Sequence, residues 1–378
     1  LWAAGIRTVT GSLVVDASLW DSTTVPGTWM VGDLPGTSGA TGGAFSIAEG
    51  VVTVEVTAGS QAGAPAQARW WPFLSDEFVT VGFVTVHPDS STQGRTIEYL
   101  PESRRLKVEG RIRAGEVDTI RVSQRDPVRI ASVALLHALE RRGIEVQGGV
   151  RIAWDEGDPV GPGSCTTGWQ LARSPEDSST VQGFGSFAAQ NPECSDAIRI
   201  TGLTSPPMAE IIKGILEPSQ NWMTEQLVRT LGAERGERGS WRNGFQMERE
   251  FLTQEVGVDS LDITYRDGSG MSTQNLVTPR ALVRILEYMR ASSNSGVFRG
   301  ALASPGEDPS TLRTRLPGLE SRVFAKTGTL THVTSLSGYV FTASGKELIF
   351  SILTNGSGLS SGEVRAGIDR IIEATARH

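Results

Sequence analysis

The chain has 378 residues, of which 38% are hydrophobic and 20% are charged, so it is long enough to bury a sizeable core in more than one domain. Its net charge of −7 argues against general nucleic-acid binding, which favours a basic face. No stretch of about 18 consecutive apolar residues is present, so the sequence indicates no transmembrane segment.

Residues 1–202 are predicted to form one module that is rich in strands. Short alternating apolar segments, typical of half-buried strands, occur at residues 51–58 and 78–86, within a strand-rich lobe at about residues 41–117. Residues 104–124 indicate two further strands joined by a turn that contains glycine.

A helix followed by a strand is predicted at about residues 126–153. Asp126 is a suitable N-cap, Pro127 fits the first helical position, and Gly143 can end the helix.

Residues 155–195 are polar and rich in glycine and proline, which predicts an irregular excursion at the surface. The two cysteines, Cys165 and Cys194, lack the neighbouring His or Cys pattern of a metal site. They could close a disulfide loop in an oxidising compartment and would be free thiols in the cytosol. Their spacing does not decide between these alternatives, and the sequence indicates no metal or other cofactor.

Residues 203–378 change in character. Apolar stripes predict two helices on either side of residues 217–220, and Thr278 followed by Pro279 begins another helix. Three strands and a last helix follow, at residues 322–325, 334–341, 347–353 and 363–376. Helices followed by hairpin-linked strands and a terminal helix indicate an α+β fold, in which helices cover an antiparallel sheet.

The segment Ser219-Gln220-Asn221 lies at the junction between two predicted helices. A loop there would expose a hydroxyl that can relay a proton and an amide that can both donate to and accept from a substrate amide. The alternative is structural, because Ser and Asn are also common helix caps.

The segment Lys326-Thr327-Gly328-Thr329 combines a positive charge with two hydroxyls. Glycine lets a ligand approach the strand backbone closely, so the segment suits a carboxylate, with a backbone N–H available for a developing oxyanion. The alternative is the end of a strand whose lysine protects an edge from aggregation.

Two other segments are interpreted as structural. Asp267 begins Asp-Gly-Ser-Gly, which is typical of a tight turn, although a catalytic role for Asp267 stays open. Residues 358–362 match the nucleophile-elbow pattern G-x-S-x-G, but no suitably placed His and Asp follow. We therefore expect Ser360 or Ser361 to be an N-cap.

The pattern S-x-N followed by K-T-G matches two of the three motifs of penicillin-binding proteins and related β-lactamases. The segments SPPMAEIIKGILEPSQNWMTEQL, DGSGMS, VTPRALVRIL, AKTGTL and SLSGYV occur in the order found in that group. The sequence therefore resembles the low-molecular-mass class C penicillin-binding proteins, which are serine D-alanyl-D-alanine carboxypeptidases of the type that also act as endopeptidases. The segments AAGIRTVTGSLVVDAS, VPGTWMVGDLP and DPVRIASVALLHALERRGIEVQGGV are similar to the large insertion that those enzymes carry.

The resemblance implies a β-lactamase/transpeptidase-like catalytic lobe, whose C-terminal part would be residues 203–378, with residues 1–202 as the insertion module. It implies an envelope enzyme, periplasmic or extracellular, that cuts D-Ala-D-Ala ends or cross-links of peptidoglycan stem peptides and that β-lactams acylate.

By the same resemblance, Ser219 and Asn221 form the second motif, and Lys326, Thr327 and Gly328 form the third. Thr329 would place a hydroxyl near the substrate carboxylate and a backbone N–H at the oxyanion hole.

The nucleophile motif S-x-x-K of this family is absent from these 378 residues. A serine needs a neighbouring base, which a lysine one helical turn later supplies. The four lysines are preceded, three residues earlier, by residues other than serine: Arg104 before Lys107, Glu210 before Lys213, Val323 before Lys326 and Ala343 before Lys346. We expect that the chain is a fragment whose nucleophile lies in a preceding segment.

Three functions stay open at this level. The first is most of a peptidoglycan D,D-peptidase that is inactive without its nucleophile segment. The second is a non-catalytic relative that binds peptidoglycan stems, and the third is a class C β-lactamase or an esterase-like hydrolase, against which the long insertion argues.

Overall fold

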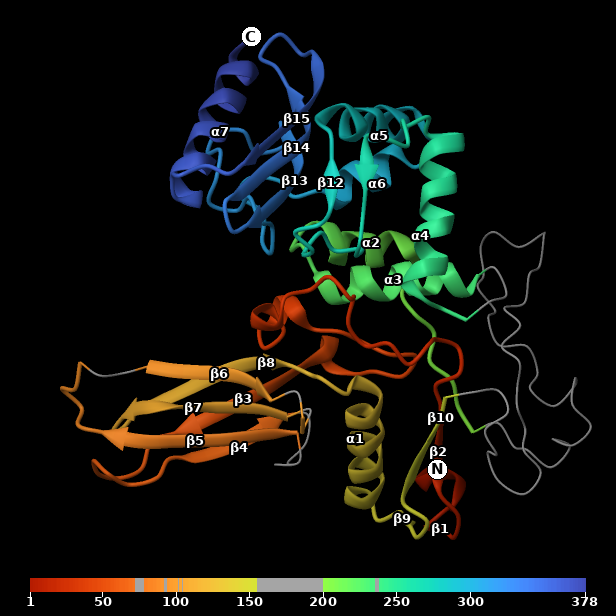
Figure 1. The fold of residues 1–378 in the computed structure, drawn as a ribbon, viewed down its shortest axis with the longest axis vertical. Coiled ribbons are helices and arrows are strands. Elements are labelled where there is room, and N and C mark those ends of the chain that lie inside the picture. Colours follow the sequence, from red (N-terminus) through yellow and green to blue (C-terminus); the bar gives the residue numbers. More distant parts are fainter. Residues whose placement is uncertain (72–77, 92–93, 101, 104, 155–199, 235–237) are drawn as a thin grey trace, which may run out of the picture. The chain divides into compact units, whose positions relative to one another are not determined.

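The computed structural model describes residues 1–71, 78–91, 94–100, 102–103, 105–154, 200–234 and 238–378. Helices and mainly antiparallel sheets are both present, which confirms the predicted α+β class (Figure 1). The excursion expected at residues 155–195, with Cys165 and Cys194, lies outside the described residues.

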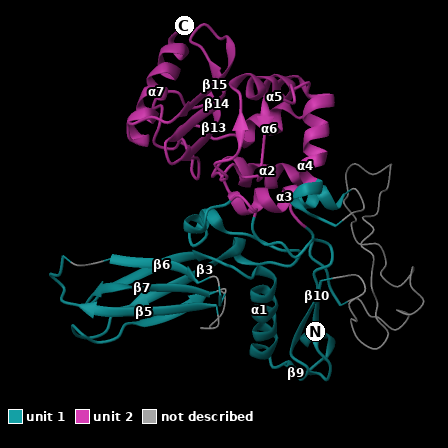
Figure 2. Ribbon diagram, in the orientation of Figure 1, with its two compact units in different colours: residues 1–25, 29–204, 229–243 teal, residues 26–28, 205–228, 244–378 magenta. Residues whose placement is uncertain are grey.

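The chain divides into two compact units, which are coloured separately in Figure 2. Unit 1 consists of residues 1–25, 29–204 and 229–243, and unit 2 consists of residues 26–28, 205–228 and 244–378. That a domain boundary lies near residue 202, between an insertion module and a catalytic part, stays a prediction from the sequence.

The strand-rich lobe of unit 1 contains two three-stranded sheets. One has the order β4-β3-β8, with β3 at Val51–Thr57, β4 at Gln67–Trp71 and β8 at Val117–Ser123. The other has the order β5-β7-β6, with β5 at Val79–Val86, β6 at Gly94–Leu100 and β7 at Arg105–Arg113. Because side chains alternate along a strand, Val54 and Val56 of β3 share one buried core with Val108 of β7.

The two strands predicted at residues 104–124 are β7 and β8, and Gly115 at φ +86° lies in the turn between them. They do not form a hairpin with each other: β7 pairs with β5 and β6, whereas β8 pairs with β3. Each strand therefore contributes its buried residues to the shared core from a different sheet.

Helix α1 (Pro127–Arg141) has the predicted N-terminus, with Pro127 in the first turn, and Gly143 follows it at φ +71°. Asp126 is at the N-cap position, but its side chain makes no capping hydrogen bond.

Two short parallel pairs complete this region, β1 (Thr8–Val9) with β9 (Glu145–Val146) and β2 (Leu13–Asp16) with β10 (Val150–Ala153). Short 3₁₀ helices occur at Trp2–Ala4, Val31–Asp33, Thr37–Gly39 and Ala48–Gly50.

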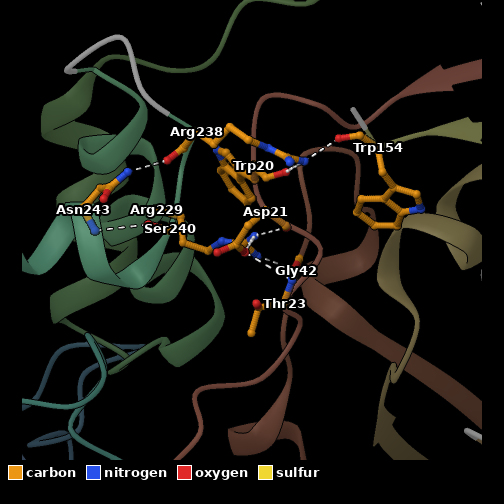
Figure 3. Close-up of polar contacts among 9 residues, drawn as sticks. All are labelled: Trp20, Asp21, Thr23, Gly42, Trp154, Arg229, Arg238, Ser240 and Asn243. Carbon is orange, nitrogen blue, oxygen red and sulfur yellow. Dashed lines mark hydrogen bonds and ion pairs between the residues drawn. The ribbon is translucent and has the colours of Figure 1, made fainter. Parts of the chain in front are cut away.

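Arg229 joins the segment 229–243 to the N-terminal residues of unit 1 (Figure 3). Its side chain is 1% exposed, and its guanidinium carbon lies 4.7 Å from the ring centroids of both Trp20 and Trp241. Nη2 donates to Oδ1 of Asp21 at 2.9 Å, and Nη1 donates to the carbonyl of Gly42 at 3.3 Å. A buried charge is tolerated here because it has an ion pair, backbone acceptors and aromatic faces around it.

The sheet of unit 2 has the order β13-β14-β15 and is antiparallel throughout. The strands are β13 (Val323–Leu330), β14 (Val333–Phe341) and β15 (Glu347–Asn355). Helix α7 (Ser361–Arg377) packs Ile368 and Ile372 against Val340 and its neighbours. Tyr339, the residue before Val340 on β14, belongs instead to a cluster with Leu286 and Leu302, so the two faces of the sheet are covered separately.

Two helices within residues 203–378 were not predicted from the sequence. Helices α2 (Met208–Leu216), α3 (Asn221–Ala233) and α5 (Pro279–Ala291) were expected. Helix α4 (Trp241–Glu250), which continues as a π-helix at Phe251–Glu255, and α6 (Ser295–Ala301) were missed, because α4 is mostly polar and α6 is short. A short antiparallel pair, β11 (Ile263–Thr264) with β12 (Leu276–Val277), completes the unit.

Two predicted N-caps are confirmed in this unit. The Thr278 hydroxyl accepts a hydrogen bond from the N–H of Ala281 at 3.1 Å. Ser360 forms a capping box with Glu363, each side chain bonding the other's backbone N–H. This contact explains the serine of the G-x-S-x-G match as a structural residue.

Candidate active site

The turn between α2 and α3 brings Ser219 out of the helical conformation. Ser219 has φ +63°, a left-handed backbone that side chains other than Gly, Asn and Asp rarely adopt. Gln220, rather than Ser219, takes the N-cap position: its Oε1 accepts from the N–H of Met223 at 3.4 Å, and its carbonyl accepts from Thr224. The interpretation of Ser219 as a helix cap is therefore wrong.

The hydroxyl of Ser219 contacts the lysine of the second candidate segment. Nζ of Lys326 donates to Oγ of Ser219 at 2.6 Å and to the carbonyl of Thr327 at 2.9 Å. Lys326 is partly buried, and burial lowers the pKa of its ammonium to about 8. Two side chains separated by 107 residues in the sequence thus meet at hydrogen-bond distance.

Residues 326–329 lie inside strand β13, not after its end as the sequence analysis expected. The pairing with β14 continues to Leu330, with Lys326 opposite Ser337 and Gly328 opposite Ser335. Among the described residues β13 is an edge strand of the sheet, and no strand of that part of the chain pairs with its outer edge beyond the bridge between Ala303 and Ala325.

Close packing explains why position 328 is occupied by glycine. A Cβ at this position would lie 2.4 Å from Oγ of Ser335, so any side chain would require that hydroxyl to rotate away.

The two threonines of this segment have different surroundings. Thr329 is exposed. The hydroxyl of Thr327 donates to Oγ1 of Thr311 at 2.9 Å, and the N–H of Thr311 donates to the carbonyl of Glu217. Thr311 was not identified from the sequence, because no motif surrounds it.

Asn221 begins α3 and contacts a loop that is distant in sequence. Its Nδ2 lies 3.8 Å from Sδ of Met271. Asp267, at the start of this loop, is buried, and its Oδ1 accepts from the N–H of Gly270 at 2.9 Å and from Nδ2 of Asn275 at 2.6 Å. The N–H of Ser272 also bonds to it. These contacts are those of a carboxylate that organises a turn.

Glu225, one helical turn after Asn221, was not predicted from the sequence. Glu225 is 0% exposed, and its carboxylate accepts from the backbone N–H groups of Gly268 and Ser269 at 2.8–3.2 Å. Burial, together with the negative charge of Glu225, raises the pKa of Glu248 to about 7. A glutamate on a helix has no sequence signal of its own, so only the fold reveals this contact.

Side chains that hold metals form no cluster among the described residues, where His, Cys, Asp and Glu nowhere gather in groups of three or more. None of the helices described here combines the length and apolarity needed to cross a membrane.

Comparison with known proteins identifies the family. The model of the D-Ala-D-Ala carboxypeptidase 3 (S13) family matches residues 1–159 and 184–378. The chain belongs to this family. Ser219 and Lys326 both lie within the matched residues.

Among S13 relatives, the D-alanyl-D-alanine carboxypeptidase of Actinomadura sp. (strain R39) is 29% identical over 372 residues. That alignment covers 94% of this chain and 61% of the relative, so the chain spans less than two thirds of that protein. The D-alanyl-D-alanine carboxypeptidase DacB of Haemophilus influenzae is 28% identical over 171 residues, which cover 44% of this chain and 35% of the relative.

The fold is similar to that of penicillin binding protein 4 (dacB) from Haemophilus influenzae, with a TM-score of 0.73 and 19% identity over all of this chain and 77% of the other. The same protein complexed with a novel β-lactam gives a TM-score of 0.66 at 18% identity, covering 99% of this chain and 74% of the other. At these identities the match shows the fold alone.

Proposed function

We propose that this chain is the larger part of a serine D-alanyl-D-alanine carboxypeptidase or endopeptidase that acts on peptidoglycan stem peptides in the cell envelope. The observation that carries the proposal is the hydrogen bond from Lys326 to Ser219, which joins the two motifs of an S13 family member in one site. The nucleophilic serine and its lysine would come from an S-x-x-K segment outside these residues.

In the proposed reaction, the oxygen of that serine bonds to the penultimate D-Ala carbonyl carbon. The C–N bond breaks, the terminal D-Ala leaves with a proton on its amine, and water later hydrolyses the acyl-enzyme. Because Lys326 donates to Oγ of Ser219, the hydroxyl proton of Ser219 is available for the leaving nitrogen. Lys326 would then return a proton to Ser219, and Asn221 would orient the substrate amide.

The terminal carboxylate of the substrate would lie along β13. Lys326 supplies positive charge and Thr329 an exposed hydroxyl, while Gly328 and the N–H of Thr329 would border the oxyanion. The hydroxyl of Thr327 donates to Thr311, so it would have to rotate before it donates to a carboxylate. β-Lactams would acylate the same nucleophile, as expected for a family with a relative solved in complex with a β-lactam.

The test uses a protein that combines this chain with the S-x-x-K segment. It should release D-alanine from a peptide that ends in D-Ala-D-Ala, and Lys326→Ala should lower kcat/KM at least about 100-fold. Lys346→Ala, which changes an exposed lysine of the same unit, should leave the rate unchanged. Without the segment, the chain should give neither turnover nor a stable penicilloyl adduct by mass spectrometry.

Three results would contradict the proposal. A penicilloyl adduct on this chain alone would locate another nucleophile. A folded longer protein that binds stem peptides without releasing D-alanine would be a binding protein. Turnover of penicillin in the absence of peptide cleavage would indicate a β-lactamase.

A further inference from the structure

Helix α3 contacts the loop at residues 267–272 at two positions on the same face. Asn221 and Glu225 are four residues apart and therefore lie one above the other on the helix. Glu225 accepts from the N–H of Gly268 at 3.0 Å and of Ser269 at 2.8 Å, and Asn221 lies 3.8 Å from Sδ of Met271. The loop thus connects the buried carboxylate to the amide of the second motif.

Four backbone N–H groups of this loop donate hydrogen bonds to carboxylates. Asp267 accepts from the N–H groups of Gly270 and Ser272, and Glu225 accepts from the two between Asp267 and Gly270. Gly268 leaves no room for a side chain, because a Cβ there would lie 2.6 Å from Cγ2 of Val228 on α3. The loop therefore lies directly on the helix.

The contact at Asn221 depends on where this loop lies. A thioether sulfur is a weak acceptor, so its contact with the Asn221 amide persists only while Met271 is held close to that amide. Charged acceptors form shorter and stronger bonds to backbone N–H groups than neutral ones do. The bonds of Glu225 to Gly268 and Ser269 hold this loop on α3, and the bonds of Asp267 hold the two residues on either side of Met271.

We propose that Glu225 is a positioning residue, which holds residues 267–272 against α3 so that Met271 keeps the side-chain amide of Asn221 in its working orientation. The catalytic consequence rests on the proposed function, whereas the physical connection between Glu225 and Asn221 exists in this chain by itself. Glu225 does not touch substrate in this scheme and acts through Asn221.

The first test measures the connection without activity. Glu225→Gln keeps the size of the side chain but replaces one acceptor oxygen by a donor. The N–H groups of Gly268 and Ser269 should then exchange with solvent at least about tenfold faster, and the side-chain amide signal of Asn221 should shift in the NMR spectrum. Asp369→Asn is the matched control, because it removes the ion pair of Asp369 with Arg315 elsewhere in the same unit.

The second test measures the consequence for catalysis in the longer protein. Glu225→Gln should lower kcat for D-alanine release about tenfold or more, and Asn221→Ala should lower it further. Because the two residues act in series, the double variant should be no slower than Asn221→Ala alone. The Asp369→Asn control should change the free energy of unfolding and leave kcat unchanged.

The outcomes are separable. Unchanged exchange at Gly268 and Ser269 in Glu225→Gln, or an unmoved Asn221 signal, would overturn the proposal. Multiplicative losses of kcat in the double variant would also overturn it. A longer protein without any activity would refute the proposed function, and the exchange and NMR measurements would still decide the role of Glu225.

Discussion

Nζ of Lys326 donates a hydrogen bond to Oγ of Ser219 over 2.6 Å, although 107 residues separate the two in the chain. The lysine is partly buried in the face of an edge strand, and the serine has a left-handed backbone in a helix–helix turn. The charge of Lys326 and the backbone strain of Ser219 can therefore be measured by separate experiments.

The first prediction concerns the charge of Lys326. Since burial lowers its pKa from the ordinary 10.5 to about 8, the ammonium should lose its proton at a lower pH than that of Lys107. The chain has four lysines, so their ¹³Cε NMR signals can be assigned by single substitutions. Lys107 is an internal control, because Glu109 raises its pKa. A midpoint above 10 for Lys326 would contradict the prediction.

If Lys326 holds the substrate carboxylate, its titration should also appear in the kinetics. Between pH 7 and pH 9, KM of the longer protein should rise as the positive charge is lost, while an uncharged ester substrate should show no such rise. A flat KM for the carboxylate substrate through this range would exclude Lys326 from carboxylate binding.

The second prediction concerns the strain at Ser219. A left-handed backbone costs a residue with a Cβ about 1 kcal/mol, whereas glycine adopts it without that cost. Ser219→Ala and Ser219→Gly both lose the bond with Lys326, so their difference isolates the strain. Ser219→Gly should be the more stable by about 1 kcal/mol in urea unfolding, and equal stabilities would show that the backbone relaxes.

The third prediction concerns Glu248. Its pKa is raised from 4.5 to about 7 in the folded protein by burial and by the charge of Glu225, so the folded state retains a proton that the unfolded state releases. Stability is therefore lost as pH rises from about 4.5 to 7. Glu248→Gln should stabilise the chain on the order of 1–3 kcal/mol at pH 8 and have little effect at pH 4.

Urea unfolding at both pH values checks this sign. A stabilisation of equal size at pH 4 and pH 8 would show that packing, not ionisation, is responsible.

The fourth prediction concerns Arg229. Its planar guanidinium contacts two indole rings and bonds Asp21 and Gly42, which a lysine cannot reproduce. Arg229→Lys should lower the free energy of unfolding by about 2–4 kcal/mol and weaken the near-ultraviolet circular dichroism of the flanking tryptophans. Arg313→Lys, in an exposed pair with Asp308, should change stability by less than about 0.5 kcal/mol.

Local features were largely readable from the residues. The N-termini of α5 and α7 could be predicted from Thr278 with Pro279 and from Ser360 with Glu363, because an N-cap side chain bonds a backbone N–H only a few residues away. The strand β13 was predicted too short, since Lys, Thr and Gly have low or mixed strand preference and only pairing with β14 extends it. Helix α4 was missed because most of its residues are polar.

The sequence by itself determined the α+β class, most of the helices and strands of residues 203–378, and the family whose motifs it carries. Only the tertiary structure decided that Ser219 meets Lys326, that Thr327 bonds Thr311 and that Glu225 bonds the loop after Asp267. The physical reason is the distance along the chain between the interacting residues. Caps, turns and periodicity are satisfied by neighbours in the chain, whereas these hydrogen bonds form only after packing has brought distant residues together.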